Sequence, residues 1–233
     1  MTKVAKDLTN ADSLRLAAAD GHRFAAYRSR PKEGKPKGGL VVIQEIFGAN
    51  RHIRGVADAY AAEGYLCLAP SLFDRIEPGL EYGYDPKGIE TGRACRQKIS
   101  NEQALADIGA AVSWRKGEGL PVAVVGFCWG GLLAWLAAAE LPISGAASFY
   151  GGGIENHAAR HRPKTPIQLH YGLKDGYIDS AARATARANA PQAEYFEYEA
   201  DHGFCCDERG SWHAESAATA RGHVLDFLHR VLG

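Results

Sequence analysis

The sequence predicts a doubly wound α/β fold, in which helices cover both faces of a mostly parallel sheet. Short apolar runs alternate along the chain with segments of helical spacing, which indicates strands joined by crossover helices. The apolar runs also lack polar alternation, which is typical of strands buried on both faces. No repeat and no long linker interrupts the chain, so we expect one domain over residues 1–233.

The expected elements start with a β-hairpin around Asp20-Gly21, whose strands we place at 14–18 and 23–27. Later strands are expected where β-branched or aromatic residues cluster between breakers, at 39–44, 65–69, 122–125, 146–150, 166–171 and 194–199. Helices are expected between and after them, at 53–62, 102–114, 132–139, 179–190 and 211–232.

Two segments fit neither pattern. The basic, proline-containing segment 28–38 is typical of a solvated surface loop. The segment 71–92 follows a strand and contains several Gly, Pro and Tyr residues. Long irregular loops of compact domains often form lids or carry binding residues, so we expect such a loop at 71–92.

The composition disfavours several classes of protein. With 46% hydrophobic and 23% charged residues, the chain is an ordinary globular protein rather than a disordered, collagen-like or coiled-coil one. Lys plus Arg equals Asp plus Glu at 27 each, so no overall charge attracts nucleic acid or an anionic membrane, and we expect a small-molecule ligand instead. The apolar stretch 119–139 is interrupted by Gly126 and Gly130, which favours a buried strand and helix over a membrane span.

The five cysteines are odd in number and form no CxxC pair. This pattern indicates reduced thiols rather than a disulfide framework, and it favours the cytoplasm. The first residues, MTKVAKDLTNADS, contain neither an apolar run nor a small-residue cleavage site, so we expect no secretory signal or transit peptide. Cys205 and Cys206, with His202 and His213, do not have the spacing of a standard metal site, so we expect no bound metal.

Residues 126–131 are Gly-Phe-Cys-Trp-Gly-Gly and join the strand 122–125 to a helix. The α/β hydrolases carry a G-x-S-x-G nucleophile elbow at such a junction, whereas this chain has G-x-C-x-G there and no G-x-S-x-G elsewhere. A thiol at a helix N-terminus is stabilised as a thiolate by the helix dipole. Cys128 is therefore the candidate nucleophile, with a buried structural cysteine as the alternative.

A hydrolase of this kind needs an acid and then a histidine, each on a loop after a later strand. Asp175 follows the strand 166–171, and Asp179, its rival, is placed to cap the next helix. His202 follows the strand 194–199, in the position expected for the base. We expect surface or capping roles for six other histidines: His157, His161, His170, His213, His223 and His229.

These motifs resemble those of the dienelactone hydrolase family of α/β hydrolases, over a region that runs from about Asp20 to the C-terminus. The motifs that carry the resemblance are QEIFG at 44–48, APSLF at 69–73, GFCWGG at 126–131, FYGGGIE at 149–155, GLKDGYI at 172–178 and DHGF at 201–204. Their combination and order are more specific than any single motif. The resemblance implies an α/β-hydrolase fold and a hydrolase of carboxylic esters.

The resemblance also implies the roles of the reacting residues. Cys128, His202 and Asp175 correspond to the family's nucleophile, base and acid, and Glu45 corresponds to the glutamate that takes the thiol proton when substrate binds. The thiolate is expected to open a lactone or enol ester and to form a thioester, which His202 hydrolyses with water. This chemistry needs no metal or organic cofactor.

The oxyanion hole and the substrate contacts are implied in the same way. The backbone N–H groups of Trp129 and Ile46 correspond to the oxyanion hole. Arg75 matches the first of two arginines that hold a substrate carboxylate, whereas Cys206 stands where the second is expected, and Arg209 is a candidate replacement. The remaining candidates for substrate binding are aromatic: Phe47, Tyr150 with its neighbour Phe149, and Phe204.

Two other functions stay open at this point. Because Cys206 replaces the expected arginine, a hydrolase of another small ester, lactone or thioester with the same triad is the first alternative. The second is a binding or thiol-sensing module in which Cys128 reacts without turnover, although a sensor has no need of a histidine that activates water. The sequence leaves the oligomeric state undetermined.

Overall fold

The structure, a computed structural model, describes residues 9–233. These residues form two compact units, 9–123 and 124–231, and the boundary lies inside a strand. One domain over the whole chain therefore stays a prediction. Residues 1–8, which make up much of the segment where we expect no targeting signal, lie outside the described residues.

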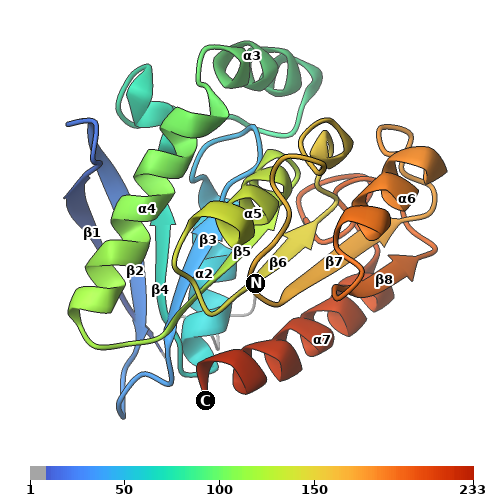
Figure 1. Cartoon of the computed structure of the whole chain (residues 1–233). Coiled ribbons are helices and arrows are strands. Elements are labelled where there is room, and N and C mark those ends of the chain that lie inside the picture. The colour runs from blue at the N-terminus through green and yellow to red at the C-terminus, as the bar shows by residue number, and fades with distance from the viewer. Residues whose placement is uncertain (1–8) are drawn as a thin grey trace. The chain divides into compact units, whose positions relative to one another are not determined.

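The strands described in the first unit are ordered β1-β2-β4-β3 (Figure 1). β1 pairs with β2, and β2 with β4, in the antiparallel direction, whereas β3 and β4 are parallel. α2 and α4 cover opposite faces of these strands. The elements are β1 Thr9–Ala17, β2 Arg23–Pro31, β3 Gly39–Ile43, α2 Arg51–Ala62, β4 Leu66–Pro70, η1 Leu72–Arg75, α3 Pro86–Gln97 and α4 Asn101–Gly117.

β1 and β2 form the expected hairpin, but both strands are longer than predicted. β2 ends at Pro31, so the first four residues of the segment 28–38 are strand rather than surface loop. β2 pairs with β4 as well as with β1, and Ser29 lies opposite Cys67 of β4. Pairing with β1 along its whole length, and with β4 as far as Ser29, therefore holds basic residues in a strand that the local sequence does not predict.

After its first residue, the segment 71–92 is irregular only at residues 76–85, so the loop is shorter than the sequence predicted. The 3₁₀ helix η1 forms at its start, and α3 begins at Pro86, in the first-turn position that suits proline. The local signal for α3 is weak because its buried residues are two glycines and one cysteine rather than an apolar stripe. The glycines allow close packing, since a Cβ at Gly92 would collide with the carbonyl oxygen of Ile46.

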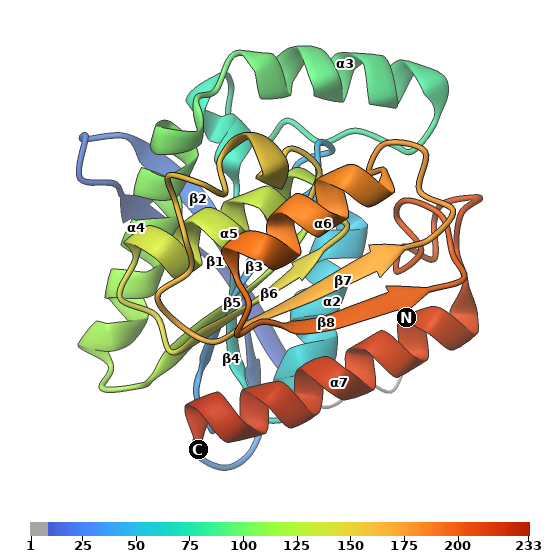
Figure 2. The ribbon, with the colours of Figure 1, turned by 45° about the vertical axis from the view of Figure 1, so that its right-hand side comes forward.

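The strands described in the second unit are ordered β5-β6-β7-β8, and β6, β7 and β8 are parallel. α5 and α6 cover one face and α7 the other (Figure 2). On one face of β6, the Ser148 hydroxyl donates to the carbonyl of Gly131 in α5. On the other face, Gly145 lies against Phe227 of α7. The elements are β5 Val122–Phe127, α5 Trp129–Glu140, β6 Gly145–Phe149, η2 Ile154–Asn156, β7 Ile167–Gly172, α6 Ser180–Asn189, β8 Glu194–Tyr198 and α7 Ala214–Leu232.

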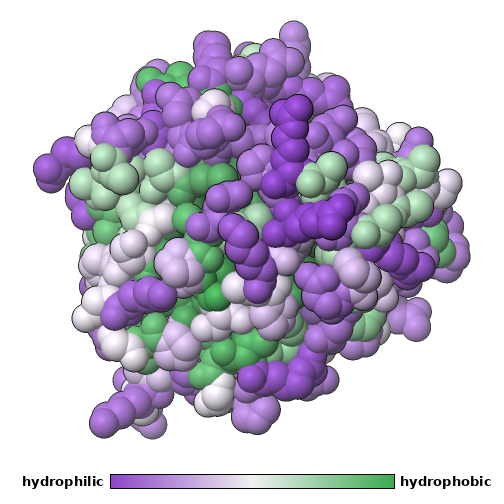
Figure 3. All heavy atoms as spheres, viewed as in Figure 1, coloured by the Kyte–Doolittle hydropathy of each residue, from purple (hydrophilic) through white to green (hydrophobic). Residues whose placement is uncertain are grey.

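The apolar stretch 119–139 contributes β5 and most of α5, and nearly all residues of both elements are buried. β5 continues through Gly126 to Phe127, two residues beyond the predicted end. Among the described residues, no helix is long and apolar enough to cross a membrane. On the face that Figure 3 shows, hydrophilic side chains surround smaller groups of hydrophobic ones.

Candidate active site

Cys128 lies at a sharp turn between β5 and α5. Its backbone has φ 56° and ψ −115°, a conformation that L-residues rarely adopt. The Cys128 N–H donates to the carbonyl of Phe149 at 3.0 Å, and α5 begins at the next residue, Trp129. A strained residue of this kind costs about 1–3 kcal/mol and persists only where its surroundings fix it. The turn therefore has the geometry of a nucleophile elbow.

Glycines make this turn possible. A Cβ at Gly126 would collide with the carbonyl oxygen of Gly130, and a Cβ at Gly131 would collide with the carbonyl oxygen of Phe149 at the end of β6. The chain can therefore reverse direction within a few residues and still pack α5 on the strands. The first turn of α5 then directs its N–H groups toward the region of Cys128, where their partial positive charge favours a thiolate or an oxyanion.

Asp175 lies on the loop that follows β7. Its Oδ1 accepts a hydrogen bond from the Tyr177 N–H at 2.8 Å, which closes a tight turn, and its Oδ2 faces the imidazole of His202. Asp179 instead caps α6, because its Oδ1 accepts from the N–H of Ala182 at 2.8 Å. The structure therefore brings Asp175, and not its rival, to the histidine.

His202 links the carboxylate to the thiol. Its Nδ1–H donates to Asp175 Oδ2 at 2.7 Å, and its side chain is also hydrogen-bonded to the side chain of Cys128. Burial disfavours the imidazolium, but the charges of Cys128 and Asp175 outweigh burial and raise the pKa of His202 to about 10. The three side chains form a continuous Asp–His–Cys arrangement within the second unit.

Aromatic rings lie around His202. The ring centroids of Tyr150 and Tyr177 are 5.1 Å and 5.2 Å from the imidazole centroid, and Phe204 packs against Tyr150 at 5.5 Å. Tyr150 is fully buried and has φ 38°, whereas Tyr177 is 69% exposed. Tyr150 and Phe204 are predicted from the sequence but Tyr177 is not. Its position two residues after Asp175, where its N–H closes the turn, is the signal that could have found it.

Cys206 and Arg209 lie on the same loop as His202. Cys206 is fully buried, and its N–H donates to the carbonyl of Gly203 at 2.9 Å. The guanidinium of Arg209 packs against Gly203, where a Cβ would collide with it. The position where an arginine was expected is thus occupied by the buried thiol of Cys206. The cation of Arg209 nevertheless lies against Gly203, the residue that follows His202.

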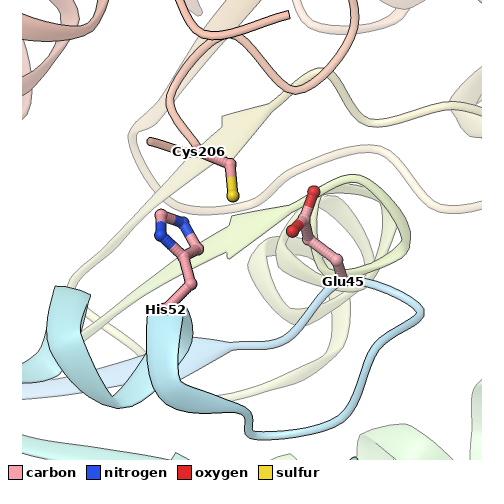
Figure 4. A group of neighbouring side chains, drawn as sticks. All are labelled: Glu45, His52 and Cys206. Atoms are coloured by element: carbon pink, nitrogen blue, oxygen red, sulfur yellow. The ribbon is translucent and has the colours of Figure 1, made fainter. Parts of the chain in front are cut away.

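Glu45 lies in the first unit, on the loop between β3 and α2, and its side chain is fully buried. Figure 4 shows Glu45 on this loop, His52 in the first turn of α2 and, from the second unit, Cys206 on the loop after β8. Gln44 holds the loop in place. Its Nε2 donates to the carbonyl of Glu45 at 3.2 Å, and its Oε1 accepts from the N–H of Leu72 at 3.0 Å.

Ile46 and Phe47 complete the same motif. The ring of Phe47 is 2% exposed and packs against Tyr84, with 4.5 Å between centroids. The carbonyl of Phe47 accepts from the N–H of Tyr82 at 3.0 Å. Residues of the segment 71–92 therefore pack directly on the QEIFG motif within the first unit.

Arg75 is held by carboxylates of the first unit. Its Nε and Nη2 donate to the two oxygens of Asp107, each at 2.8 Å, and Nη2 also lies 2.8 Å from Asp20. The fully buried Asp107 also lies 3.0 Å from the Nδ1 of His22. Burial raises the pKa of Asp107, although Arg75 and His22 act in the opposite direction. Because this bidentate pair already orients the guanidinium, binding of a substrate carboxylate by Arg75 stays a prediction.

Residues 24–232 match the family model described as the dienelactone hydrolase family. The chain belongs to the dienelactone hydrolase family. A carboxymethylenebutenolidase of Pseudomonas sp. (strain P51) is 32% identical to it over 231 residues, which cover 94% of this chain and 95% of that protein. A protein of Synechocystis sp., provisionally given the same name, is 37% identical over 221 residues, which cover 85% of this chain and 88% of that protein.

A solved structure from Klebsiella pneumoniae, provisionally named a dienelactone hydrolase, matches the fold with a TM-score of 0.80. Its sequence is 31% identical to this chain, and the match covers 93% of this chain and 98% of the Klebsiella chain. The fold is therefore the α/β-hydrolase fold, and this member of the dienelactone hydrolase family is a hydrolase that acts on carboxylic esters or lactones. The Asp–His–Cys arrangement follows the ends of the strands β5, β7 and β8, the places at which α/β hydrolases in general carry their triads.

Proposed function

We propose that this protein hydrolyses a lactone or enol ester of the dienelactone type through a thioester on Cys128. The observation that carries the proposal is the hydrogen-bonded series Asp175–His202–Cys128, with the cysteine in a strained turn at a helix N-terminus. The carboxymethylenebutenolidase of Pseudomonas sp. supports a lactone as the substrate. The partner is a small molecule rather than nucleic acid or a membrane. A thiol nucleophile needs reducing surroundings, and we therefore assign the protein to the cytoplasm.

Acylation begins when the Cys128 sulfur attacks the carbonyl carbon of the substrate. A C–S bond forms, and the carbonyl oxygen becomes an oxyanion, for which we assign the backbone N–H groups of Trp129 and Ile46 as donors. Trp129 is the first residue of α5, so the helix dipole favours the same negative charge. The C–O bond of the ester then breaks, and the leaving enolate takes up a proton.

Two groups can take the proton of the Cys128 thiol. The resemblance of QEIFG assigns this step to Glu45, which returns the proton to the leaving oxygen. His202 is the second group, because its raised pKa favours an imidazolium beside a thiolate.

The variant Glu45→Gln separates the two routes. If Glu45 is the base, acylation measured by stopped flow slows by about 10²-fold or more while deacylation is unchanged, whereas unchanged acylation assigns the proton to His202.

Deacylation depends on a change in the pKa of His202. Once Cys128 is acylated, the thiolate charge that raises this pKa is gone, while Asp175 remains. The pKa then falls, and the neutral imidazole takes a proton from water. The hydroxide attacks the thioester, the C–S bond breaks, and the departing thiolate recovers the proton from His202. The carboxylic acid product then leaves.

The proposal is tested by hydrolysis of a dienelactone and of an aryl ester. We expect Cys128→Ala to lose both activities and His202→Gln to accumulate an acyl group on Cys128, seen as a mass increase of the peptide that contains it. Cys205→Ala is the matched control, since it removes another thiol of the same unit. Equal rates for the wild type and Cys128→Ala would overturn the proposal.

The buried Cys206 favours a second candidate, a hydrolase of another small ester, lactone or thioester with the same triad. Because Arg75 is already bound by Asp107, we assign Arg209 as the cation for a substrate carboxylate. If the substrate carries a carboxylate, Arg209→Met should raise KM by about tenfold for the carboxylated lactone and leave KM for its methyl ester unchanged. Equal KM values in wild type and variant would favour the second candidate.

A thiol-sensing module is the remaining candidate. It would be labelled once per Cys128 by an acyl donor and would release no acid product. The hydrogen bonds of His202 to both Asp175 and Cys128 favour turnover instead, since a module that stops at the acylated cysteine has no need of a base that activates water.

A further inference from the structure

Within the described residues, five stacked rings cross the second unit on the face that α7 covers. Each strand contributes one ring and α7 the last: Phe127 of β5, Phe149 of β6, His170 of β7, Phe196 of β8 and His223 of α7. Successive ring centroids lie 4.9, 4.4, 5.0 and 4.0 Å apart, and successive ring planes are inclined by 22°, 7°, 18° and 17°. The stack therefore runs from the residue before Cys128 to α7.

The stack follows from the register of the parallel strands. Phe149 lies opposite His170, and His170 lies opposite Phe196. Neighbouring strands are about 4.8 Å apart, a spacing at which flat side chains in register can stack on each other. The surface or capping role predicted for His170 is wrong, because its side chain is fully buried at the centre of this stack.

Hydrogen bonds at the edge of the His170 ring join the same strands. The Gln168 Nε2 donates to the Glu194 carboxylate at 3.1 Å and to the His223 carbonyl at 3.2 Å. The Gln168 Oε1 therefore accepts, from the Nε2–H of His170 at 3.2 Å. His170 Nδ1 is then an acceptor and receives the O–H of Tyr198 at 2.9 Å, while His223 Nδ1–H donates to the Tyr198 oxygen at 3.2 Å. Both ring nitrogens of His170 are thus hydrogen-bonded in the neutral tautomer that carries its proton on Nε2.

His170 must stay neutral to keep these bonds. A proton on its Nδ1 would remove the acceptor that the Tyr198 O–H needs. Burial, together with the nearby His223, lowers the pKa of His170 to about 3. Burial also raises the pKa of Tyr198. His170 and Tyr198 are therefore uncharged at neutral pH and hold the same hydrogen bonds throughout the pH range in which His202 acts.

The strands that His170 and Tyr198 join lead into the loops of the acid and the base. Asp175 lies three residues beyond the end of β7 at Gly172. His202 lies four residues beyond the end of β8 at Tyr198. A shift of β7 against β8 would therefore change the distance between the Asp175 carboxylate and the imidazole.

The two loops stay paired beyond the strand ends. The N–H of Leu173 donates to the carbonyl of Tyr198 at 2.8 Å, and the N–H of Lys174 donates to the carbonyl of Ala200 at 3.0 Å. The backbones approach so closely that a Cβ at Gly172 would collide with the carbonyl oxygen of Ala200. Displacements at Tyr198 are therefore transmitted to both loops.

Ring contacts connect Tyr198 to the base as well. The Tyr198 ring packs against Phe204 at 5.0 Å, Phe204 against Tyr150 at 5.5 Å, and Tyr150 against His202 at 5.1 Å. The imidazole of His202 is thus supported from the same side of the strands on which His170 lies.

We propose that His170 and Tyr198 are positioning residues for the catalytic acid and base. By joining β7 to β8, they hold Asp175 and His202 at hydrogen-bonding distance, and they do so without touching the substrate. The inference rests on the proposed function only in that Asp175 and His202 are the acid and the base.

Tyr198→Phe tests the inference, because it removes one hydroxyl and leaves the ring on Phe204. We expect kcat to fall about tenfold with KM within about twofold of wild type. We also expect the acid limb of the kcat profile to move to lower pH, because a looser bond to Asp175 raises the pKa of His202 less. An unchanged kcat, or a lower kcat with an unmoved acid limb, overturns the proposal.

Tyr195→Phe is the matched control, since Tyr195 lies in the same strand and contacts Arg187 of α6 on the opposite face. We expect wild-type kcat and an unmoved acid limb. A second test variant, His170→Phe, keeps a ring in the stack and removes both hydrogen bonds at the edge of the His170 ring, so it should show the same effect as Tyr198→Phe. If one of the two variants folds poorly, the other still tests the inference. Equal profiles for His170→Phe and Tyr195→Phe would contradict the inference.

An NMR titration of His202 in the free protein provides a readout that needs no turnover. In Tyr198→Phe the pKa of His202 should fall by about half a unit or more, and in Tyr195→Phe it should not change. A protein that shows this shift but hydrolyses no lactone would refute the proposed function and keep the positioning role. A protein that hydrolyses lactones but shows no shift would refute the positioning role alone.

Discussion

His202 and His170 are both buried histidines of the second unit, but their surroundings move their pKa values in opposite directions. Burial acts to lower both. Around His170 burial prevails and the pKa falls to about 3. Around His202 the charges of Cys128 and Asp175 offset burial, and the pKa rises to about 10. The His170 ring is therefore neutral at neutral pH, whereas the His202 ring lies beside charged partners that favour its protonated form.

The difference shows that partners, rather than burial, decide what a histidine in this fold can do. A third case in the first unit supports this conclusion. His22 lies 3.0 Å from the buried Asp107, as in a catalytic pair, but the same carboxylate binds Arg75 on both oxygens. The guanidinium of Arg75 therefore already balances the charge of the Asp107 carboxylate. Among the described residues, the contacts given for His22 and Asp107 include no cysteine. The Asp175–His202 pair differs from the Asp107–His22 pair in that its histidine is also hydrogen-bonded to a cysteine.

The largest expected effect comes from removal of the thiol. Cys128→Ala should lower the rate of lactone hydrolysis by about 10⁴-fold. The same variant should lower the pKa of His202 by more than about one unit, because the charge that does most to raise it is gone. Hydrolysis assays and an NMR titration of His202 check the two results. An unchanged pKa would show that Asp175 alone sets the difference between the two histidines.

The next effect comes from the acid. Asp175→Asn should lower kcat by about 10³-fold, because the amide cannot stabilise the imidazolium of His202. Asp179→Asn is the matched control, since asparagine caps a helix as well as aspartate does and Asp179 caps α6 rather than bonding to the histidine. Steady-state kinetics of both variants check this, and comparable losses would mean that the acid has been wrongly assigned.

A smaller effect is expected in the pH dependence of stability. His170 binds a proton in the unfolded chain below about pH 6.5 but remains neutral in the folded protein down to about pH 3. The unfolded state therefore gains protons as the pH falls through this range. His170 thus lowers the free energy of unfolding of the wild type by up to about 1.4 kcal/mol for each pH unit. The stability advantage of the wild type over His170→Phe should therefore shrink from pH 6.5 to 4. Urea denaturation at several pH values measures the difference in free energy of unfolding between the two proteins. A difference that does not change with pH would contradict the neutral state of His170.

The smallest effect is expected at the helix cap. Asp179→Ala should reduce the free energy of unfolding by about 1 kcal/mol, because the N–H of Ala182 loses its acceptor. The pKa values of His170 and His202 should not change, since Asp179 bonds to neither. Thermal or urea denaturation measures the first result and NMR the second. A shifted pKa at His202 would show that the cap also holds the loop of Asp175.

The sequence by itself determined the fold class, the family and the positions of the candidate triad along the chain. These features rest on local signals. Glycines surround Cys128 because the turn has no room for a Cβ, and Asp175 and His202 directly follow apolar strands. Local signals failed where packing rather than composition makes the element. α3 packs through glycines, and the basic end of β2 is held by pairing with β1 and, as far as Ser29, with β4.

Only the tertiary structure decided the partners of the polar side chains. Tyr198 lies 28 residues from His170, Asp107 lies 32 residues from Arg75, and the same aspartate lies 85 residues from His22. The register of neighbouring strands places His170 inside a ring stack rather than at the surface, and a bidentate carboxylate occupies Arg75. The physical reason is that burial and hydrogen-bond partners depend on which strands and loops meet in space, and no pattern within one segment specifies that.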